Sequence, residues 1–294
     1  MHTLKIRFQE IKPALSLFYL SFMGCLCVMG VQIYLDLKIE PLICLCSMGI
    51  IFGIYTSNRF TDTAEDFTND ISKLLFFQKK RIFFALAIAS LVASFGILMV
   101  REKLNWLYLL LLAIGMSYSF RLIPWYSRER GWVMLRIKEI TFIKNLAVSF
   151  LWGSSVFAVP ILYASSEIPH KFTLLMLGVG LFLSTFNNTL FDDVMDEAGD
   201  RVAGIKTLPT TVGPKSSIRL LMGLDLLWLV TVAACFAASC FDAHHAAFLW
   251  FLGLYPFLYM GLNATGRVSK NWVALLAESD LLFFGLGLIL LRTA

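Results

Sequence analysis

The sequence predicts an all-α, polytopic membrane protein with about nine transmembrane helices around a central cavity that opens at the cytoplasmic side. Of its 294 residues 58% are hydrophobic and only 15% are charged, whereas a soluble protein carries about 25% charged residues. The apolar residues also gather into runs close to the ~20 residues that cross a bilayer. We therefore expect a single domain, residues 1–294, whose spans lie at about 13–33, 40–57, 82–100, 104–121, 141–163, 171–191, 217–238, 246–264 and 271–291.

The positive charges give the predicted orientation. With the N-terminus in the cytoplasm, 20 of the 25 Lys and Arg residues fall on the cytoplasmic side, as the positive-inside rule requires. This predicts an integral, multi-pass protein of the cell membrane in contact with membrane lipid. The net charge of +5 then follows from topology, so no nucleic-acid partner is expected.

The connections between the spans separate short turns from long segments. The short link at 101–103 makes the third and fourth spans antiparallel neighbours. Three longer segments, about 58–81, 122–140 and 192–216, all fall on the cytoplasmic side, and long ordered loops are usually functional. The seventh and ninth spans contain ionisable residues, which usually face the interior of a helix bundle and serve a function: Asp225, Glu278 and Asp280.

An acidic cluster follows the second span. Asn58, Asp62 and Asp66 recur every four residues, which places them on one face of a helix. Carboxylate oxygens on one face are ligands for Mg²⁺, and Mg²⁺ in turn bridges to phosphate oxygens. Arg59 is predicted either to contact a phosphate or to form a surface ion pair.

A denser acidic cluster follows the sixth span. Asp192, Asp196 and Asp200 share one helix face, and Asp193 lies three and seven residues before the last two. Four aspartates within nine residues repel one another unless cations neutralise them, so a metal site is predicted. After it, Gly199 and Gly204 are expected to end or bend the helix, and Pro209 stops its continuation. Lys206 is placed to meet a metal-bound phosphate.

The two clusters resemble the motifs of the UbiA superfamily of intramembrane prenyltransferases, which carries N-D-x-x-D-x-x-x-D after its second helix and again later in the chain. In the first motif Asn58, Asp62 and Asp66 match, and Arg59 stands where the family has its first Asp. In the second, Asp193, Asp196 and Asp200 match the acids and Asp192 replaces the usual Asn. The G-x-x-T-L-P sequence that often follows is also present, at Gly204, Thr207, Leu208 and Pro209.

The resemblance implies a Mg²⁺-dependent transfer of a prenyl group from a prenyl diphosphate to a lipophilic acceptor, an aromatic compound or quinone precursor. The resemblance assigns the metal to the acids of both clusters and the diphosphate to Asn58, Arg59, Lys144 and Lys206. Tyr118, Arg121 and Lys144 resemble the family's cytoplasmic stretch between the fourth and fifth helices, which contacts diphosphate or acceptor, and are the expected catalytic residues. Cationic side chains there would stabilise the departing pyrophosphate.

Two other functions remain open from the sequence. One is a membrane-embedded terpene cyclase, which ionises the same donor without an external acceptor. The other is a transporter of divalent cations or anionic lipids, whose acids usually lie near the bilayer midplane in broken helices. Here the acid clusters lie at the cytoplasmic ends of spans, which favours the enzyme.

Overall fold

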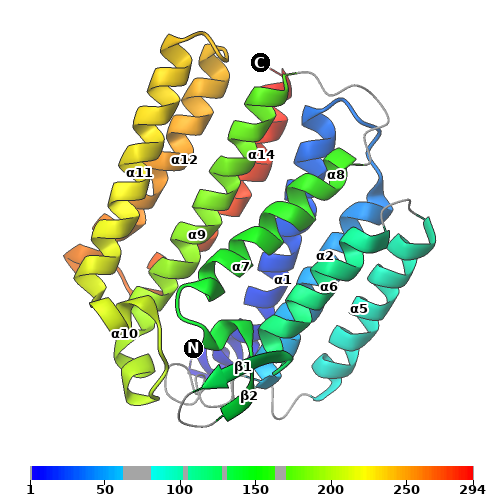
Figure 1. The fold of residues 1–294 in the computed structure, drawn as a ribbon, viewed down its shortest axis with the longest axis vertical. Coiled ribbons are helices and arrows are strands. Elements are labelled where there is room, and N and C mark those ends of the chain that lie inside the picture. The colour runs from blue at the N-terminus through cyan, green and yellow to red at the C-terminus, as the bar shows by residue number, and fades with distance from the viewer. Residues whose placement is uncertain (1, 62–80, 102–104, 128–130, 163–169, 294) are drawn as a thin grey trace. The chain divides into compact units, whose positions relative to one another are not determined.

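A computed structural model describes residues 2–61, 81–101, 105–127, 131–162 and 170–293. These residues form helices apart from one two-stranded hairpin (Figure 1). The helices are α1 (His2–Tyr34), α2 (Pro41–Thr61), α5 (Arg81–Arg101), α6 (Asn105–Ser119), the 3₁₀ helix η1 (Ile137–Glu139), α7 (Ile143–Trp152), the π-helix η2 (Gly153–Ala158), α8 (Val159–Leu162), α9 (Lys171–Val202), α10 (Leu208–Val212), α11 (Pro214–Ala237), α12 (Ala243–Thr265), α13 (Lys270–Glu278) and α14 (Asp280–Thr293).

The described helices confirm an integral, multi-pass membrane protein. Seven segments are long and apolar enough to cross a membrane by their length and composition. The predicted fourth span is the shorter helix α6, and the predicted fifth span is interrupted by the π-helix between α7 and α8. The total of nine spans therefore stays a prediction.

One element was not expected from the sequence. The predicted cytoplasmic segment 122–140 contains a hairpin of β1 (Ile123–Ser127) and β2 (Gly131–Leu135), with Ile123 opposite Leu135 and Ser127 opposite Gly131. Its strands are rich in aromatic and β-branched residues, which fit a pleated surface. The hairpin leads directly into η1 and then into α7.

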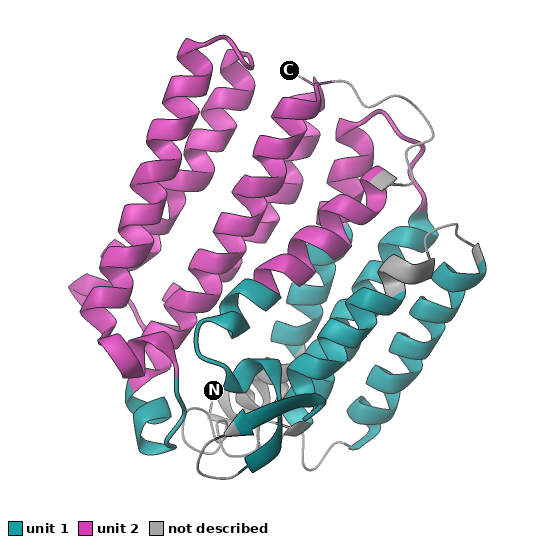
Figure 2. Ribbon diagram, in the orientation of Figure 1, with its two compact units in different colours: residues 1–25, 41–147, 198–206 teal, residues 26–40, 148–197, 207–294 magenta. Residues whose placement is uncertain are grey.

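By its internal contacts the chain divides into two compact units, each assembled from separate stretches of sequence (Figure 2). Unit 1 comprises residues 1–25, 41–147 and 198–206, and unit 2 comprises residues 26–40, 148–197 and 207–294. The helices α1, α7 and α9 each contribute residues to both units. Each unit is described below by itself.

In unit 1, α2 packs closely against α5 and also contacts α6. Gly53 allows the close approach, because a Cβ atom there would lie 2.8 Å from the carbonyl oxygen of Ala87. The Ser90 hydroxyl donates to the Gly49 carbonyl at 3.1 Å across the same contact. Small residues bring membrane helices together in this way because lipid supplies no hydrophobic drive for their association.

In unit 2, α12 packs against α11, α13 and α14. The indole N–H of the buried Trp228 on α11 donates to the Leu249 carbonyl on α12 at 2.9 Å. Gly30 and Gly285 bring α1 and α14 together, since a Cβ at Gly30 would lie 2.6 Å from the Gly285 oxygen. The apolar core of this unit surrounds several buried polar side chains.

Candidate functional site

The first predicted motif begins in the last helical turn of α2. Asn58 and Arg59 belong to this helix, which ends at Thr61. Asp62 and Asp66, the acids of the motif, lie outside the described residues, so their assignment as metal ligands stays a prediction. The described part of the motif contributes one cationic side chain, Arg59, to the end of a membrane helix.

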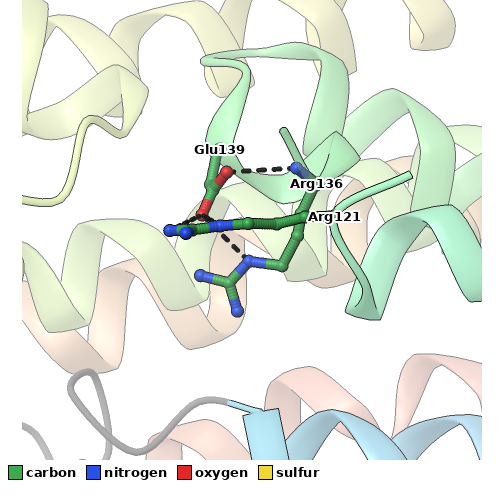
Figure 3. A network of polar contacts seen from close by, with 3 residues as sticks. All are labelled: Arg121, Arg136 and Glu139. Atoms are coloured by element: carbon green, nitrogen blue, oxygen red, sulfur yellow. Dashed lines mark hydrogen bonds and ion pairs between the residues drawn. The ribbon is translucent and has the colours of Figure 1, made fainter. Parts of the chain in front are cut away.

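A carboxylate in η1 joins the residues on either side of the hairpin. Glu139 accepts hydrogen bonds from the backbone N–H and the Nε of Arg136, both at 3.0 Å, and from Arg121 at 3.2 Å (Figure 3). Burial by itself raises the pKa of Glu139, but these hydrogen bonds and the positive charges hold it below the ordinary value. Arg121, predicted to be catalytic, therefore contacts Glu139, and its side chain is 67% exposed.

The neighbouring Lys138 is buried, with 6% of its surface exposed. Burial first, and then the positive charges of Lys144 and Arg59, lower its pKa, while Glu139 and Asp200 act in the opposite sense, and the net result is a pKa of about 7. In unit 1, Arg59 of α2 and Lys144 of α7 thus both lie within electrostatic range of Lys138 in η1. An excess of positive charge in a buried position favours an anionic ligand.

Two further residues of the predicted site belong to these elements. Lys144 lies in the first turn of α7, two residues after Phe142, whose φ of 70° is unusual for a non-glycine residue. Backbone strain of this kind persists where surrounding structure enforces it, often at functional sites. Tyr118, predicted to be catalytic, is partly buried in the last turn of α6.

The second acidic cluster is helical, as predicted from its spacing. Helix α9 continues from the membrane segment through Asp200 and ends at Val202. Gly204 then adopts φ +70°, a conformation that glycine enters without strain, so this part of the expected helix end is confirmed. Gly199 lies inside the helix and does not end it. Asp193 and Asp200 are buried, with 7% and 5% of their surfaces exposed.

Asp196 forms an ion pair that the sequence did not indicate. The Nζ atom of Lys270, at the start of α13, lies 2.7 Å from Asp196 Oδ1, with both side chains partly exposed. Within the described residues no three acidic, histidine or cysteine side chains converge as a metal cluster.

The segment after α9 returns to η1 and α7 within unit 1. The hydroxyl of Thr141 donates to the Lys206 carbonyl at 3.2 Å, and the Lys206 side chain is exposed. The chain then enters α10, where Thr207 and Thr210 cap the helix reciprocally and Pro209 occupies its first turn. Pro209 therefore lies in the first turn of a new helix, and α9 has already ended at Val202.

Three contributors to this region were not among the residues predicted to form a site. Lys138 was counted only among the cytoplasmic basic residues, and Glu139 and Lys270 were not singled out as partners of Arg121 and Asp196. Lys138 leaves no signal of its own in the sequence, because it stands among charged residues, with Arg136 two positions before it and Glu139 directly after it. The other two act through contacts between residues distant in sequence.

The chain is similar to known membrane proteins in sequence and in fold. The model of the UbiA prenyltransferase family matches residues 17–286. The apo structure of a UbiA homologue from Aeropyrum pernix K1 superposes with a TM-score of 0.66 at 18% identity, covering 92% of this chain and 97% of that one. A UbiA homologue from Archaeoglobus fulgidus bound to GPP and Mg²⁺ gives 0.65 at 14% identity, covering 97% and 100%. A comparison with curated protein sequences gives no match.

Proposed function

Because the chain belongs to the UbiA prenyltransferase family, we propose that it transfers a prenyl group from a prenyl diphosphate to a lipophilic acceptor within the membrane. We propose an aromatic compound or quinone precursor as the acceptor class. The reaction takes place in the cell membrane, with the N-terminus in the cytoplasm and the diphosphate bound at the cytoplasmic ends of the spans. The charge distribution of the sequence supports this orientation.

The observation that carries this proposal is the cationic group in unit 1. Lys144 and Arg59 both act electrostatically on Lys138, and a diphosphate is the kind of ligand that relieves such repulsion between positive charges. When the allylic C–O bond breaks, negative charge develops on the departing pyrophosphate, and preorganised cations stabilise it. We assign these three side chains to the diphosphate together with Asn58 and Lys206.

The donor chemistry of the acid clusters fits Mg²⁺. This ion is usually held by one or two carboxylates together with substrate phosphates, so the absence of a three-acid cluster among the described residues agrees with a site that the substrate completes. We propose that the metal is held by Asp62, Asp66, Asp192, Asp193, Asp196 and Asp200. Mg²⁺ supplies charge neutralisation of the diphosphate when bound.

The relatives support the same ligand class. In addition to GPP, a UbiA homologue from Archaeoglobus fulgidus has been described with DMAPP and Mg²⁺. A further similar structure, with a TM-score of 0.56, is described as a digeranylgeranylglyceryl phosphate synthase in membranes. We assign to Tyr118 and Arg121 a place beside the diphosphate or acceptor, with Arg121 also bound to Glu139.

Activity measurements test the proposal directly. Purified protein is incubated with labelled prenyl diphosphates of different lengths and candidate aromatic acceptors, with Mg²⁺ or with EDTA, and products are identified by mass. We expect transfer only with Mg²⁺, a loss on the order of 10²-fold or more for Lys144→Met, and no detectable transfer for Asp196→Ala. Lys171→Met, at the exposed start of α9, is the matched control and keeps full activity.

Two outcomes would replace the proposal. A cyclic hydrocarbon formed without any acceptor would identify a terpene cyclase acting on the same donor. Full activity of both variants, or activity unaffected by EDTA, would show that the acids and Lys144 do not hold a metal diphosphate.

A further inference from the structure

Unit 2 contains a group of polar side chains buried inside its membrane helices. Each exposes 3% of its surface or less, and they come from α9, α11, α12 and α14. We call them the buried polar cluster: Ser184, Asn187, Asp225, Tyr259 and Asp280. They have no role in the proposed prenyl transfer, so their burial requires its own explanation.

The members of this cluster lie close together. The side-chain amide of Asn187 donates to Asp225 Oδ1 at 2.5 Å. Asp280 lies beside Ser184 and within electrostatic range of Asp225. The Tyr259 hydroxyl lies within electrostatic range of both carboxyl groups and also of Asp192, so the polar atoms of four helices converge on one region.

Each member of the cluster leaves one polar atom without a hydrogen-bond partner. These atoms are Ser184 Oγ, Asn187 Oδ1, Asp225 Oδ2, Tyr259 Oη and Asp280 Oδ2. All five are oxygens, and three of them can only accept unless a carboxyl is protonated. Among the described residues, the charges that act on Asp225 and Asp280 include no lysine, arginine or histidine. The cluster therefore lacks a positive partner.

Two of the helices carry a local irregularity near this cluster. The span Lys270–Thr293 contains one residue, Ser279, between α13 and α14, but helical hydrogen bonds continue across it, from the Ser279 N–H to the Leu275 carbonyl and from the Phe283 N–H to the Ser279 carbonyl. Helix α12 contains Pro256, one turn before Tyr259, and proline removes a backbone hydrogen bond from a helix. The buried oxygens without partners, and not a broken helix, therefore indicate a ligand.

We propose that the buried polar cluster is a binding site for a monovalent cation of the Na⁺ type. Two buried carboxyls close together share one proton, because both cannot remain ionised in an apolar surrounding, and this leaves one negative charge for one monovalent cation. Five oxygens are fewer than the six to eight that Ca²⁺ takes, and Mg²⁺ retains bound water that a fully buried site does not provide. The proposal does not depend on the prenyl-transfer reaction.

The test uses the full-length protein in detergent with EDTA, so that divalent ions are absent. NaCl replaces N-methylglucamine chloride at constant ionic strength, and the midpoint of thermal unfolding is followed together with binding of ²²Na⁺. A ligand that binds only the folded state raises the midpoint as its concentration passes the dissociation constant. We expect a saturable rise with Na⁺ and a weaker one with K⁺.

Isosteric variants assign the effect to the cluster. Asp225→Asn and Asp280→Asn are expected to lose ²²Na⁺ binding and the Na⁺-dependent rise. Asp36→Asn is the matched control, because this exposed carboxylate of the same unit pairs with Arg292 at 3.1 Å, and it should bind Na⁺ like the wild type. If the cluster variants do not fold, the Na⁺ titration of the wild type alone decides.

Two results would overturn the proposal. One is a wild-type protein whose unfolding midpoint and ²²Na⁺ binding do not respond to Na⁺. If the stability of this wild-type protein then falls with rising pH, and the stability of the two Asn variants does not, the cluster binds protons and no Na⁺. The other is undiminished ²²Na⁺ binding by both Asn variants, which would place the ion elsewhere.

Discussion

Replacing the buried Lys138 by methionine should remove a specific pH dependence of stability. The pKa of Lys138 is about 7 in the folded protein and 10.5 in an unperturbed chain. Between these values the unfolded chain binds a proton that the folded protein does not, so folding becomes more favourable as the pH rises. Below pH 7 both states are protonated and the full penalty of the buried charge is present.

The size of this effect follows from the pKa difference. One proton per pH unit corresponds to about 1.4 kcal/mol. Because about half of the folded molecules still carry the proton at pH 7, wild-type protein should gain about 2 kcal/mol of unfolding free energy between pH 7 and pH 9. For a chain of this size that is a rise in unfolding midpoint on the order of 4 °C. Lys138→Met keeps the length of the side chain and its apolar contacts but cannot take up a proton.

Thermal unfolding in detergent, followed by tryptophan fluorescence at pH 7, 8 and 9, measures this dependence. We expect the wild type to show the rise and Lys138→Met to lack it, with the variant more stable than the wild type at pH 7. Lys171→Met, at an exposed helix start, should retain the wild-type slope. Equal slopes for wild type and Lys138→Met would refute the assignment of a buried, proton-releasing lysine.

Three further predictions concern binding and packing. When magnesium pyrophosphate binds at pH 8, the wild-type protein should take up close to one proton and Lys138→Met none, because the bound anion restores the positive charge of the lysine. Calorimetry in buffers of different ionisation enthalpy measures this proton uptake. Equal uptake by both proteins would contradict the prediction. Gly53→Val should destabilise the protein at the α2–α5 contact by about 1–3 kcal/mol. Gly96→Ala on the same helix pair, where an added Cβ meets nothing within 4 Å, should be neutral or stabilising. The two unfolding midpoints are compared, and equal losses of stability would show that the helices are not packed as described. Thr207→Ala should lower the unfolding free energy by about 1 kcal/mol through loss of the α10 cap; an unchanged chemical-denaturation midpoint would show that this cap does not contribute.

The sequence alone predicted the helical, membrane-spanning character of the chain and the position of the second acidic motif. Both are local properties, because hydrophobic run length decides whether a segment spans and a four-residue period decides which acids share a helix face. Asp192 and Asp196 therefore lie on the predicted helix α9. Gly204, just after the end of α9, adopts the positive φ that glycine enters without strain. Pro209 lies in the first turn of α10 and does not extend α9.

Only the tertiary structure revealed which charges meet. The sequence gives no reason to connect Lys138 with Arg59 and Asp200, or Lys270 with Asp196, because each pair joins segments that are distant along the chain. The same holds for Asn187 and Asp225, which are 38 residues apart and share a hydrogen bond. Short-range periodicity determines which residues share the face of one helix. The partner of a buried charge depends instead on how several helices pack, and the free energy of a charged side chain changes steeply with its burial.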